Sequence, residues 1–84
     1  MAHLIEFKPH VDRELEQLPG KAQASIVRAI KSLANNPRPF GCIKLKSRNA
    51  YRIRVGDYRV VYEIHDDVLI VLVVKVAHRR EVYR

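Results

Sequence analysis

The chain has 84 residues, enough for one domain with a single modest core. Hydrophobic residues make up 48% of the sequence, and this proportion excludes a disordered chain despite the high charge. The formal net charge of +7 and the sequence pI of about 10.0 favour a polyanionic partner, with an acidic protein partner as the alternative. We therefore expect residues 1–84 to form a single basic domain.

The sequence also bears on redox chemistry and on membranes. Cys42 is the only cysteine, so the chain can form neither an intrachain disulfide nor a cysteine-rich metal site. The first six residues lack the charged-then-apolar pattern of a signal peptide. The apolar run over residues 68–74 is far shorter than the roughly 20 residues that span a bilayer, and it indicates a buried strand. These features predict a cytoplasmic protein that does not contact a membrane.

The first half of the chain carries helical patterns. A weak alternation over residues 3–7 predicts a short first strand. Apolar residues at positions i, i+4 and i+7 then predict a short helix over residues 11–18. A longer apolar stripe predicts a second helix over residues 22–34, which ends there because Pro37 disfavours helical geometry at the residue before it. Pro19 and Gly20 separate the helices, so we expect a helical hairpin that lies across a sheet.

The second half carries strand patterns. A connector over residues 36–41 is expected to be anchored by its aromatic residue, and the apolar period after it changes to two. Strands are predicted over residues 51–55 and 58–65, joined by a two-residue type II′ turn, and a last buried strand over residues 68–77. The order β-α-α-β-β-β predicts an α+β fold of two layers, with the helical hairpin packed on a mainly antiparallel four-stranded sheet.

Hairpin register brings three arginines together. If Val55 faces Tyr58 across the two-residue turn, Arg54 faces Arg59, and both side chains emerge on one face of the sheet. Arg52 shares that face, roughly 7 Å along the strand. Directly opposed like charges destabilise a sheet, by something on the order of 0.2–1 kcal/mol. These arginines therefore predict an anion-binding surface, whose anion is an internal carboxylate, an acidic protein or a phosphate.

A solvated face of an amphipathic strand is the alternative interpretation of Arg52 and Arg54. The opposed pair argues against it, because Glu63 is the only acidic residue of either strand with the right facing and it lies at the far end. Arginine suits a phosphate because its planar fork holds two oxygens at once and keeps its charge near neutral pH. Phosphate of RNA is therefore the favoured anion.

Further basic residues flank this surface. If the turn after residue 65 is even in length, His78 falls on the same face as the arginines. A frayed basic tail is the alternative interpretation of residues 78–83. General electrostatic steering, or a solvated loop, is expected of the upstream cations. The upstream cations are Lys44, Lys46 and Arg48, and together with Arg80 of the C-terminal cluster they are expected to attract RNA or the ribosome.

Three stretches carry motifs in a defined order, namely Leu45-Lys46, YRIRVGDYRVVY over residues 51–62 and HRREVY over residues 78–83. In this order and spacing they resemble the RelE/ParE superfamily of bacterial and archaeal toxins, and the likeness covers essentially the whole chain. RelE-like members cut messenger RNA in the ribosomal A site, whereas ParE-like members inhibit DNA gyrase and are not nucleases. The resemblance implies a type II toxin–antitoxin system, whose acidic, extended antitoxin wraps the toxin.

The RelE branch is favoured, because gyrase-poisoning members do not need an arginine and a tyrosine at the positions of Arg79 and Tyr83. That branch implies a ribonuclease without metal or cofactor, in which the RNA 2′-hydroxyl attacks the adjacent phosphate within ribosome-bound messenger RNA. By resemblance, Arg52 and Arg54 take two basic positions that are often lysines, and Arg59 binds the scissile phosphate. Arg79 matches the arginine near the leaving group, and Tyr83 matches the tyrosine that stacks on a base.

One departure from the family pattern concerns the general base. Arg52 cannot lose its proton as a lysine in a cationic site could. The base is then His78 or Tyr83, or the reaction runs on phosphate clamping while the ribosome positions the 2′-hydroxyl. The alternative functions are a ParE-like gyrase inhibitor without nuclease activity, an inactive or repurposed family member, and a basic module whose only partner is an antitoxin.

Overall fold

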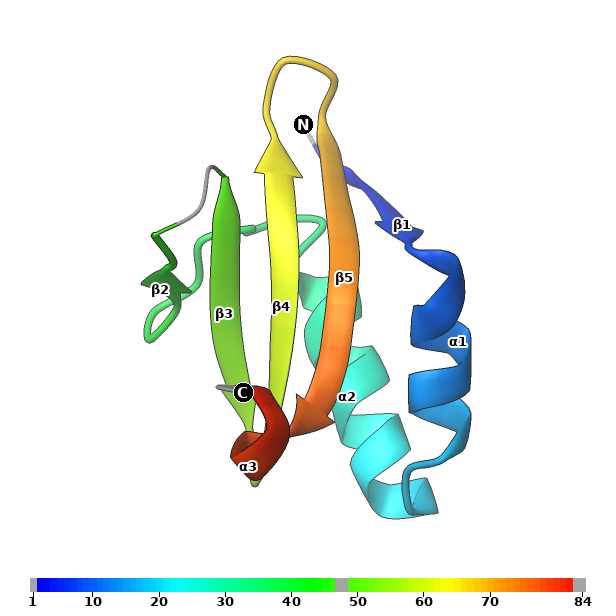
Figure 1. Ribbon diagram of the computed structural model, residues 1–84. Coiled ribbons are helices and arrows are strands. Elements are labelled where there is room, and N and C mark those ends of the chain that lie inside the picture. The colour runs from blue at the N-terminus through cyan, green and yellow to red at the C-terminus, as the bar shows by residue number, and fades with distance from the viewer. Residues whose placement is uncertain (1, 47–48, 83–84) are drawn as a thin grey trace.

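A computed structural model describes residues 2–46 and 49–82 of this protein. Its elements follow the predicted β-α-α-β-β-β order with one short strand and one short helix added (Figure 1). In chain order they are β1 (Leu4–Phe7), α1 (Pro9–Glu16), α2 (Gly20–Ser32), β2 (Ile43–Lys44), β3 (Ala50–Val55), β4 (Tyr58–His65), β5 (Ile70–His78) and α3 (Arg79–Val82). The predicted α+β class is confirmed.

The strands form one sheet in the order β1-β5-β4-β3-β2. β1 runs parallel to β5 and the other neighbours are antiparallel, as expected of a mainly antiparallel sheet. The predicted count of four strands is wrong, because Ile43 and Lys44 pair with Arg52 and Tyr51 and add the edge strand β2. Two residues are too few to show the alternation that indicates a strand in a sequence.

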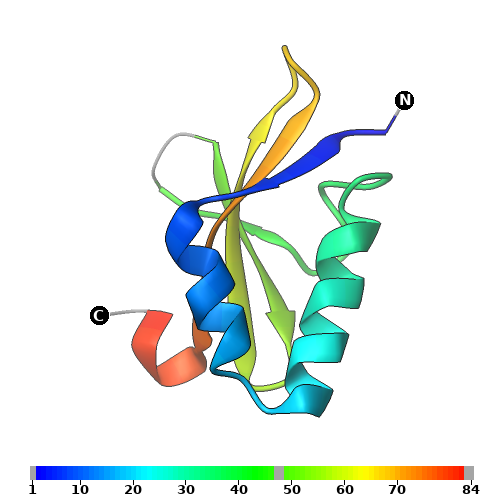
Figure 2. The ribbon, with the colours of Figure 1, turned by 90° about the vertical axis from the view of Figure 1, so that its right-hand side faces the viewer.

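The two long helices bury the apolar stripes that predicted them. α1 begins at Pro9, whose missing N–H would have no partner in the first helical turn. Val11 and Leu15 of α1 and Ile26 and Ile30 of α2 are buried. α2 lies behind the sheet and α1 lies beside β5, whereas α3 is on the opposite side of the sheet from α2 (Figures 1 and 2). One face of the sheet is therefore covered by α2, and α3 is the helix that lies on the other face within the described residues 2–46 and 49–82.

Alternate residues of the central strands fill the core beneath the helices. The fully buried aliphatic residues of β4 and β5 include Val60, Ile64, Val71 and Val73. Tyr62 is the largest buried side chain, and its hydroxyl donates a hydrogen bond to the carbonyl oxygen of Pro37 at 2.7 Å. Burial raises the pKa of Tyr62 well above its ordinary value. The bond gives the buried hydroxyl a partner and ties the connector after α2 to the sheet.

A β-bulge interrupts the pairing of β4 with β5. Tyr62 pairs with Val73, but its neighbour Val61 pairs with Lys75, so Val74 is one extra residue in β5. An extra residue reverses the facing of every side chain that follows it, because side chains along a strand alternate between the two faces. The bulge therefore decides which face of the sheet receives the end of β5.

A small polar network joins the far end of the sheet to the N-terminus. Arg38 Nη2 donates to Asp66 Oδ2 at 2.8 Å, and His3 Nε2 lies 3.0 Å from Asp66 Oδ1. Hydrogen bonds from Arg38 and then from His3 lower the pKa of Asp66. The network connects three segments that are distant in sequence, so the ionised form of Asp66 favours the folded state.

Replacing Asp66 is expected to change how stability depends on pH. A carboxyl whose pKa is lower in the folded state contributes stability above its unfolded pKa and loses it as the pH falls through the folded value. The melting temperature of the wild type should therefore fall more steeply below about pH 4 than that of Asp66→Asn. Asp67→Asn, at an exposed neighbouring carboxyl, is the matched control. Parallel melting curves for the wild type and Asp66→Asn would contradict this account.

Candidate functional site

The β3–β4 hairpin presents three arginines on one face, as its register predicted. Val55 pairs with Tyr58 and Arg54 pairs with Arg59, while Arg52 pairs with Val61 two residues further from the turn. We call this side of the sheet, away from α2 and carrying Arg52, Arg54 and Arg59, the arginine face. The predicted opposition of Arg54 and Arg59 is confirmed.

The turn itself explains this register. Gly56 has a φ of 59°, in the left-handed region that side chains with a Cβ adopt with strain. Asp57 is not among the residues with positive φ. Positive φ at the first central residue alone is the pattern of a type II′ turn, which joins two strands through two residues. The sequence at this turn therefore determines that two arginines face each other.

Two of the three arginines are buried, which is unusual for such residues. Arg52 is only 4% exposed and Arg59 only 8%, whereas Arg54 is exposed. A solvated strand face would leave all three in water, so that interpretation applies to Arg54 alone. Burial of a cation is costly unless an anion or hydrogen bonds compensate it.

The guanidinium of Arg59 is held against the turn. Its Nη1 donates to the carbonyl oxygens of Gly56 at 3.1 Å and Tyr58 at 2.9 Å. Its Nε is buried, and within residues 2–46 and 49–82 no hydrogen-bond acceptor reaches that atom. The two carbonyl contacts therefore fix the orientation of the Arg59 guanidinium.

The charges of the arginine face influence one another. Burial, and then the guanidinium groups of Arg54 and Arg59, lower the pKa of Arg52. Arg52 nevertheless stays charged at neutral pH, since arginine keeps its proton in proteins. Glu63, the acidic residue on this side of β4, has its carboxylate 2.8 Å from Nε2 of His65. Glu63 is therefore engaged at the far end of the strand, away from the opposed pair of Arg54 and Arg59.

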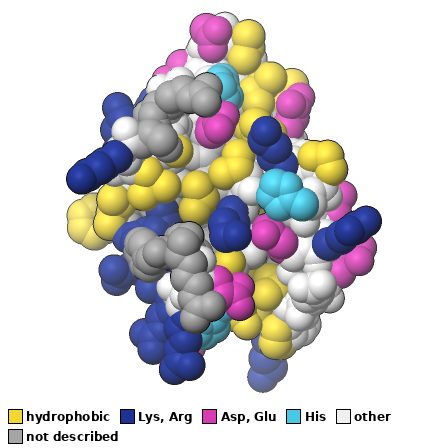
Figure 3. All heavy atoms as spheres, viewed as in Figure 1, with side chains coloured by type: hydrophobic (Ala, Val, Ile, Leu, Met, Phe, Trp, Pro, Cys, Tyr) yellow, Lys and Arg dark blue, Asp and Glu magenta, His cyan; other side chains and the backbone are white. Residues whose placement is uncertain are grey.

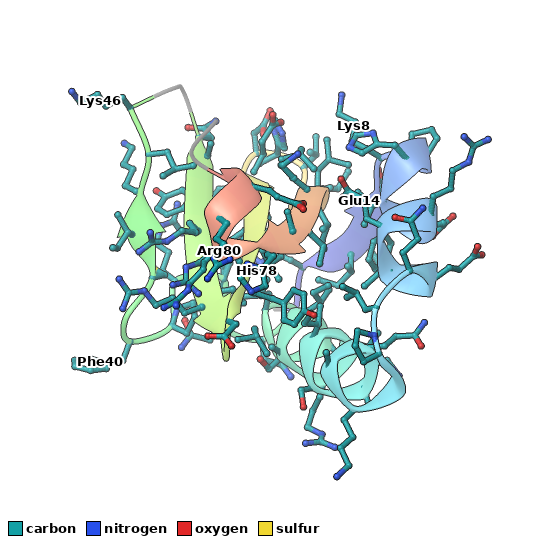
Figure 4. The ribbon with its side chains drawn as sticks, turned by 60° about the horizontal axis from the view of Figure 1, so that its bottom comes forward. Lys8, Glu14, Phe40, Lys46, His78 and Arg80 are labelled. Atoms are coloured by element: carbon teal, nitrogen blue, oxygen red, sulfur yellow. The ribbon has the colours of Figure 1, made fainter. Side chains whose placement is uncertain are left out.

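α3 brings further cationic residues to the hairpin. The backbone N–H of Arg79 donates to the carbonyl oxygen of Asp57 at 2.8 Å, so the helix begins at the β3–β4 turn. Arg79 and Arg80 are both exposed. Figure 4 views this end of the molecule and shows Arg80 and His78 emerging close together beside the end of β5. Tyr83 and Arg48, both predicted site residues, lie outside the described residues.

The predicted facing of His78 is wrong. The turn after β4 spans the four residues 66–69, and this even length would have placed His78 on the arginine face. The bulge at Val74 reverses the alternation, so His78 pairs with Tyr58 and its ring meets the edge of the Tyr58 ring, with centroids 5.6 Å apart. By register His78 therefore faces the helix side, at the end of the sheet, where it lines a cleft of about 320 Å³ together with Glu14 of α1 and Glu81 of α3. Its Nδ1 accepts a hydrogen bond from the backbone N–H of Arg80 at 3.3 Å.

The other predicted cations of the described residues include two lysines at the β2 edge of the sheet. Lys44 on β2 and Lys46 after it are exposed. Lysine and arginine side chains gather over the side of β2 and β3 and over the hairpin end (Figure 3). Lys46 lies at a corner of the molecule away from Arg80 (Figure 4). Contact of these residues with RNA or the ribosome stays a prediction.

A groove that the sequence did not indicate borders the arginine face. It holds about 590 Å³, and apolar residues such as Leu33 and Ile43 line it with Arg52 and Arg54. Phe40 also lines it and is fully exposed, so the expectation that this residue anchors the connector is wrong. The groove was missed because it is assembled from α2, the connector and β3, whose apolar residues are unremarkable within each segment.

Comparisons with known proteins agree with this geometry. The sequence matches the family described as the ParE toxin of the type II toxin–antitoxin system parDE over residues 5–83, so the chain belongs to this toxin family. It is 29% identical to toxin RelG of Mycobacterium tuberculosis, with 100% of this chain and 99% of the relative covered. It is 33% identical to toxin RelE3 of Methanocaldococcus jannaschii, with 84% of each covered.

The fold is also that of a solved toxin. The archaeal RelE–RelB complex from Pyrococcus horikoshii contains a chain that superposes with a TM-score of 0.85 at 26% identity, covering 96% of this chain and 99% of that one. The protein is thus a toxin of a type II toxin–antitoxin system, of the RelE type within the RelE/ParE superfamily.

Two further observations concern membranes and metals. None of the described helices is both long and apolar enough to cross a membrane. In the part of the chain that the structure describes, histidine, cysteine, aspartate and glutamate side chains form no group of three that could hold a metal ion.

Removing one charge of the opposed pair is expected to stabilise the free protein. Arg54→Gln removes the repulsion with Arg59 while it keeps a polar, uncharged side chain at an exposed position, so the free energy of unfolding should rise by about 0.2–1 kcal/mol at low salt. Urea denaturation measures this change, and high salt should reduce it by screening the charges. A loss of stability at low salt would show that Arg54 is already compensated within the chain.

Proposed function

We propose that this toxin is a ribosome-dependent endoribonuclease that cleaves messenger RNA, with the arginine face as its phosphate site. One observation carries the proposal, namely that Arg54 and Arg59 face each other beside the buried Arg52. Similarity to RelG and RelE3 supports the RelE type. An RNA strand supplies phosphates at a spacing that neighbouring arginines can clamp, and it relieves their mutual repulsion.

The proposed reaction needs little beyond charge and position. The RNA 2′-hydroxyl attacks the adjacent phosphorus, the bond to the 5′ oxygen breaks, and the products are a 2′,3′-cyclic phosphate and a 5′-hydroxyl. Negative charge grows on the phosphoryl oxygens in the transition state, and fixed cations that point at those oxygens lower the barrier. Arg59 suits this task because two backbone carbonyls hold its guanidinium in place before substrate arrives.

The remaining residues take secondary roles in this proposal. Arg54 is exposed and meets the phosphate directly, while the buried Arg52 adds positive potential from below. Arg79 lies at the hairpin turn, where it neutralises the leaving oxygen, and Tyr83 stacks on a base as the family resemblance implies. Arg80 and the lysines of the β2 side extend the field toward ribosomal RNA.

We do not propose His78 as the general base, because its ring lies on the helix side of the sheet against Tyr58. Arg52 keeps its proton at neutral pH and cannot serve either. Phosphate clamping therefore supplies most of the catalysis, and the ribosome positions the 2′-hydroxyl in the A site. Tyr83 is the remaining side chain that could accept the proton.

We also propose that a cognate antitoxin neutralises this protein in the cytoplasm. The Pyrococcus horikoshii RelE was crystallised with RelB, which supports a partner of this kind. An acidic, extended chain that wraps the toxin matches its net charge of +7.

Gyrase inhibition is the second candidate function. One observation favours it, since the family that the sequence matches over residues 5–83 is described as the ParE toxin. A gyrase inhibitor would use the surface for protein binding and would leave RNA intact.

Arg59→Ala is expected to lower the rate of messenger RNA cleavage sharply in a translation reaction. Removing one preorganised donor from a site of developing charge lowers a rate by roughly 10²–10³-fold. Primer extension that maps new 5′ ends measures the loss, and Arg13→Ala on the exposed side of α1 is the charge-matched control. Gyrase supercoiling is assayed in parallel. Intact message combined with lost supercoiling would overturn the nuclease proposal in favour of gyrase inhibition.

His78→Asn is expected to retain most of the cleavage activity. Loss of a general base typically costs about 10²–10⁴-fold in rate. The His78 ring packs against Tyr58 and its Nδ1 already accepts a hydrogen bond from the backbone N–H of Arg80, so we do not expect it to take the proton. The single-turnover rate on ribosome-bound message is the quantity to compare. A fall within that range, with an unchanged melting temperature, would show that His78 turns toward the arginine face during the reaction.

A further inference from the structure

The outer edge of β5 is only half covered by a strand. β1 pairs with β5 from Ile70 to Val73, and the N–H of Lys8 donates to the carbonyl oxygen of Val73 at 3.0 Å. The chain then leaves the sheet to form α1, while β5 continues to His78. Backbone groups on the second half of this edge need other partners, because unsatisfied peptide groups are costly.

Two side chains of α1 take the place of the missing strand. His10 Nε2 donates to the carbonyl oxygen of Val74 at 2.6 Å, and the N–H of Val76 donates to Glu14 Oε1 at 2.8 Å. Residues four apart lie on one face of a helix, so one side of α1 presents both groups to β5. The bond to the Glu14 carboxylate is charge-assisted and therefore among the stronger kinds.

These bonds flank the bulge. Val74 is the extra residue of β5, and Val76 is the first core residue after it. The other carboxylate oxygen of Glu14 lies 4.0 Å from Nζ of Lys75, so all three residues of this segment are held by α1. The extra residue is thereby kept at one position along the strand.

The held segment leads directly to the arginine face. Ala77 pairs with Arg59, and two residues later the N–H of Arg79 bonds to the carbonyl oxygen of Asp57. If the bulge were lost, the alternation after it would reverse and Ala77 would exchange faces with its neighbours. The position of Arg79 against the hairpin turn thus depends on the segment that α1 holds.

We propose that Glu14 and His10 are positioning residues of the arginine face. They hold the bulge of β5 in place, and through it they set the position of α3 and Arg79 relative to Arg54 and Arg59. The effect on cleavage rests on the proposed nuclease function, whereas the effect on the backbone of β5 and α3 does not.

Three variants test this inference. Glu14→Ala removes the acceptor, Glu14→Gln keeps an amide oxygen at the same position, and Glu16→Ala on an exposed site of the same helix is the charge-matched control. His10→Ala removes the second contact from an exposed side chain, so it tests the inference even if Glu14→Ala fails to fold.

Amide hydrogen exchange and cleavage are then measured together. For Glu14→Ala the amides of Val76 and Arg79 should exchange about tenfold faster or more, because a hydrogen bond to a charged group is lost, while the amide of Val71 is unchanged. His10→Ala should speed exchange in the same segment. The cleavage rate at saturating ribosomes should fall without a change in the half-saturating concentration, and Glu14→Gln should restore it.

The outcomes separate this inference from the proposed function. Wild-type exchange at Val76 and Arg79 in both Glu14→Ala and His10→Ala would overturn the positioning role. Equal loss of cleavage in Glu14→Ala and Glu14→Gln would also overturn it, because the charge rather than the hydrogen bond would then matter. If the exchange results are as expected but the wild type cuts no message, the nuclease proposal fails and the positioning of α3 stands.

Discussion

The opposition of Arg54 and Arg59 across a two-residue turn is the constraint on which the site depends. Gly56 makes the tight turn possible, the turn sets the register, and the register puts two cations on directly opposite positions. Arg52 lies beside them with little solvent contact, so three positive charges are concentrated on one face of the hairpin. Repulsion between the opposed arginines lowers the stability of the free protein, and a bound polyanion raises it by cancelling that repulsion. This relation is expected of a binding site.

The helices and the bulge of β5 determine what surrounds the β3–β4 hairpin. Among the described residues, α2 covers the opposite face of the sheet and α3 lies on the side of the arginine face (Figure 2). The bulge at Val74 then reverses the facing of the residues that follow it in β5. As a result His78 pairs with Tyr58 and faces the helix side, while Arg79 starts α3 at the hairpin turn. One extra residue therefore turns the His78 ring against Tyr58, while α3 starts with Arg79 at the hairpin turn. This orientation of the ring favours a mechanism that relies on charge rather than on a histidine base.

Much of this could be predicted from the sequence, because periodicity and turn chemistry are local properties. The α+β class, the helical hairpin and the Arg54–Arg59 opposition follow from patterns a few residues long. The bulge could not be predicted, since it depends on His10 and Glu14, which lie more than sixty residues away in sequence. The strand β2 and the groove beside Arg52 were missed for a similar reason, because each exists only when distant segments pack together. Tyr83 and Arg48 lie outside the described residues, so their roles remain predictions.

The central claim is that the opposed arginines bind an RNA phosphate together. Titrating the protein with a short RNA whose 2′-hydroxyls are methylated, so that it cannot be cleaved, tests this claim most directly. The guanidinium N–H signals of Arg54 and Arg59, followed by NMR, should shift together with one saturation curve that weakens as salt rises. Arg13 on α1 provides an internal reference. Signals of Arg54 and Arg59 that stay unchanged while RNA binds elsewhere would contradict the account.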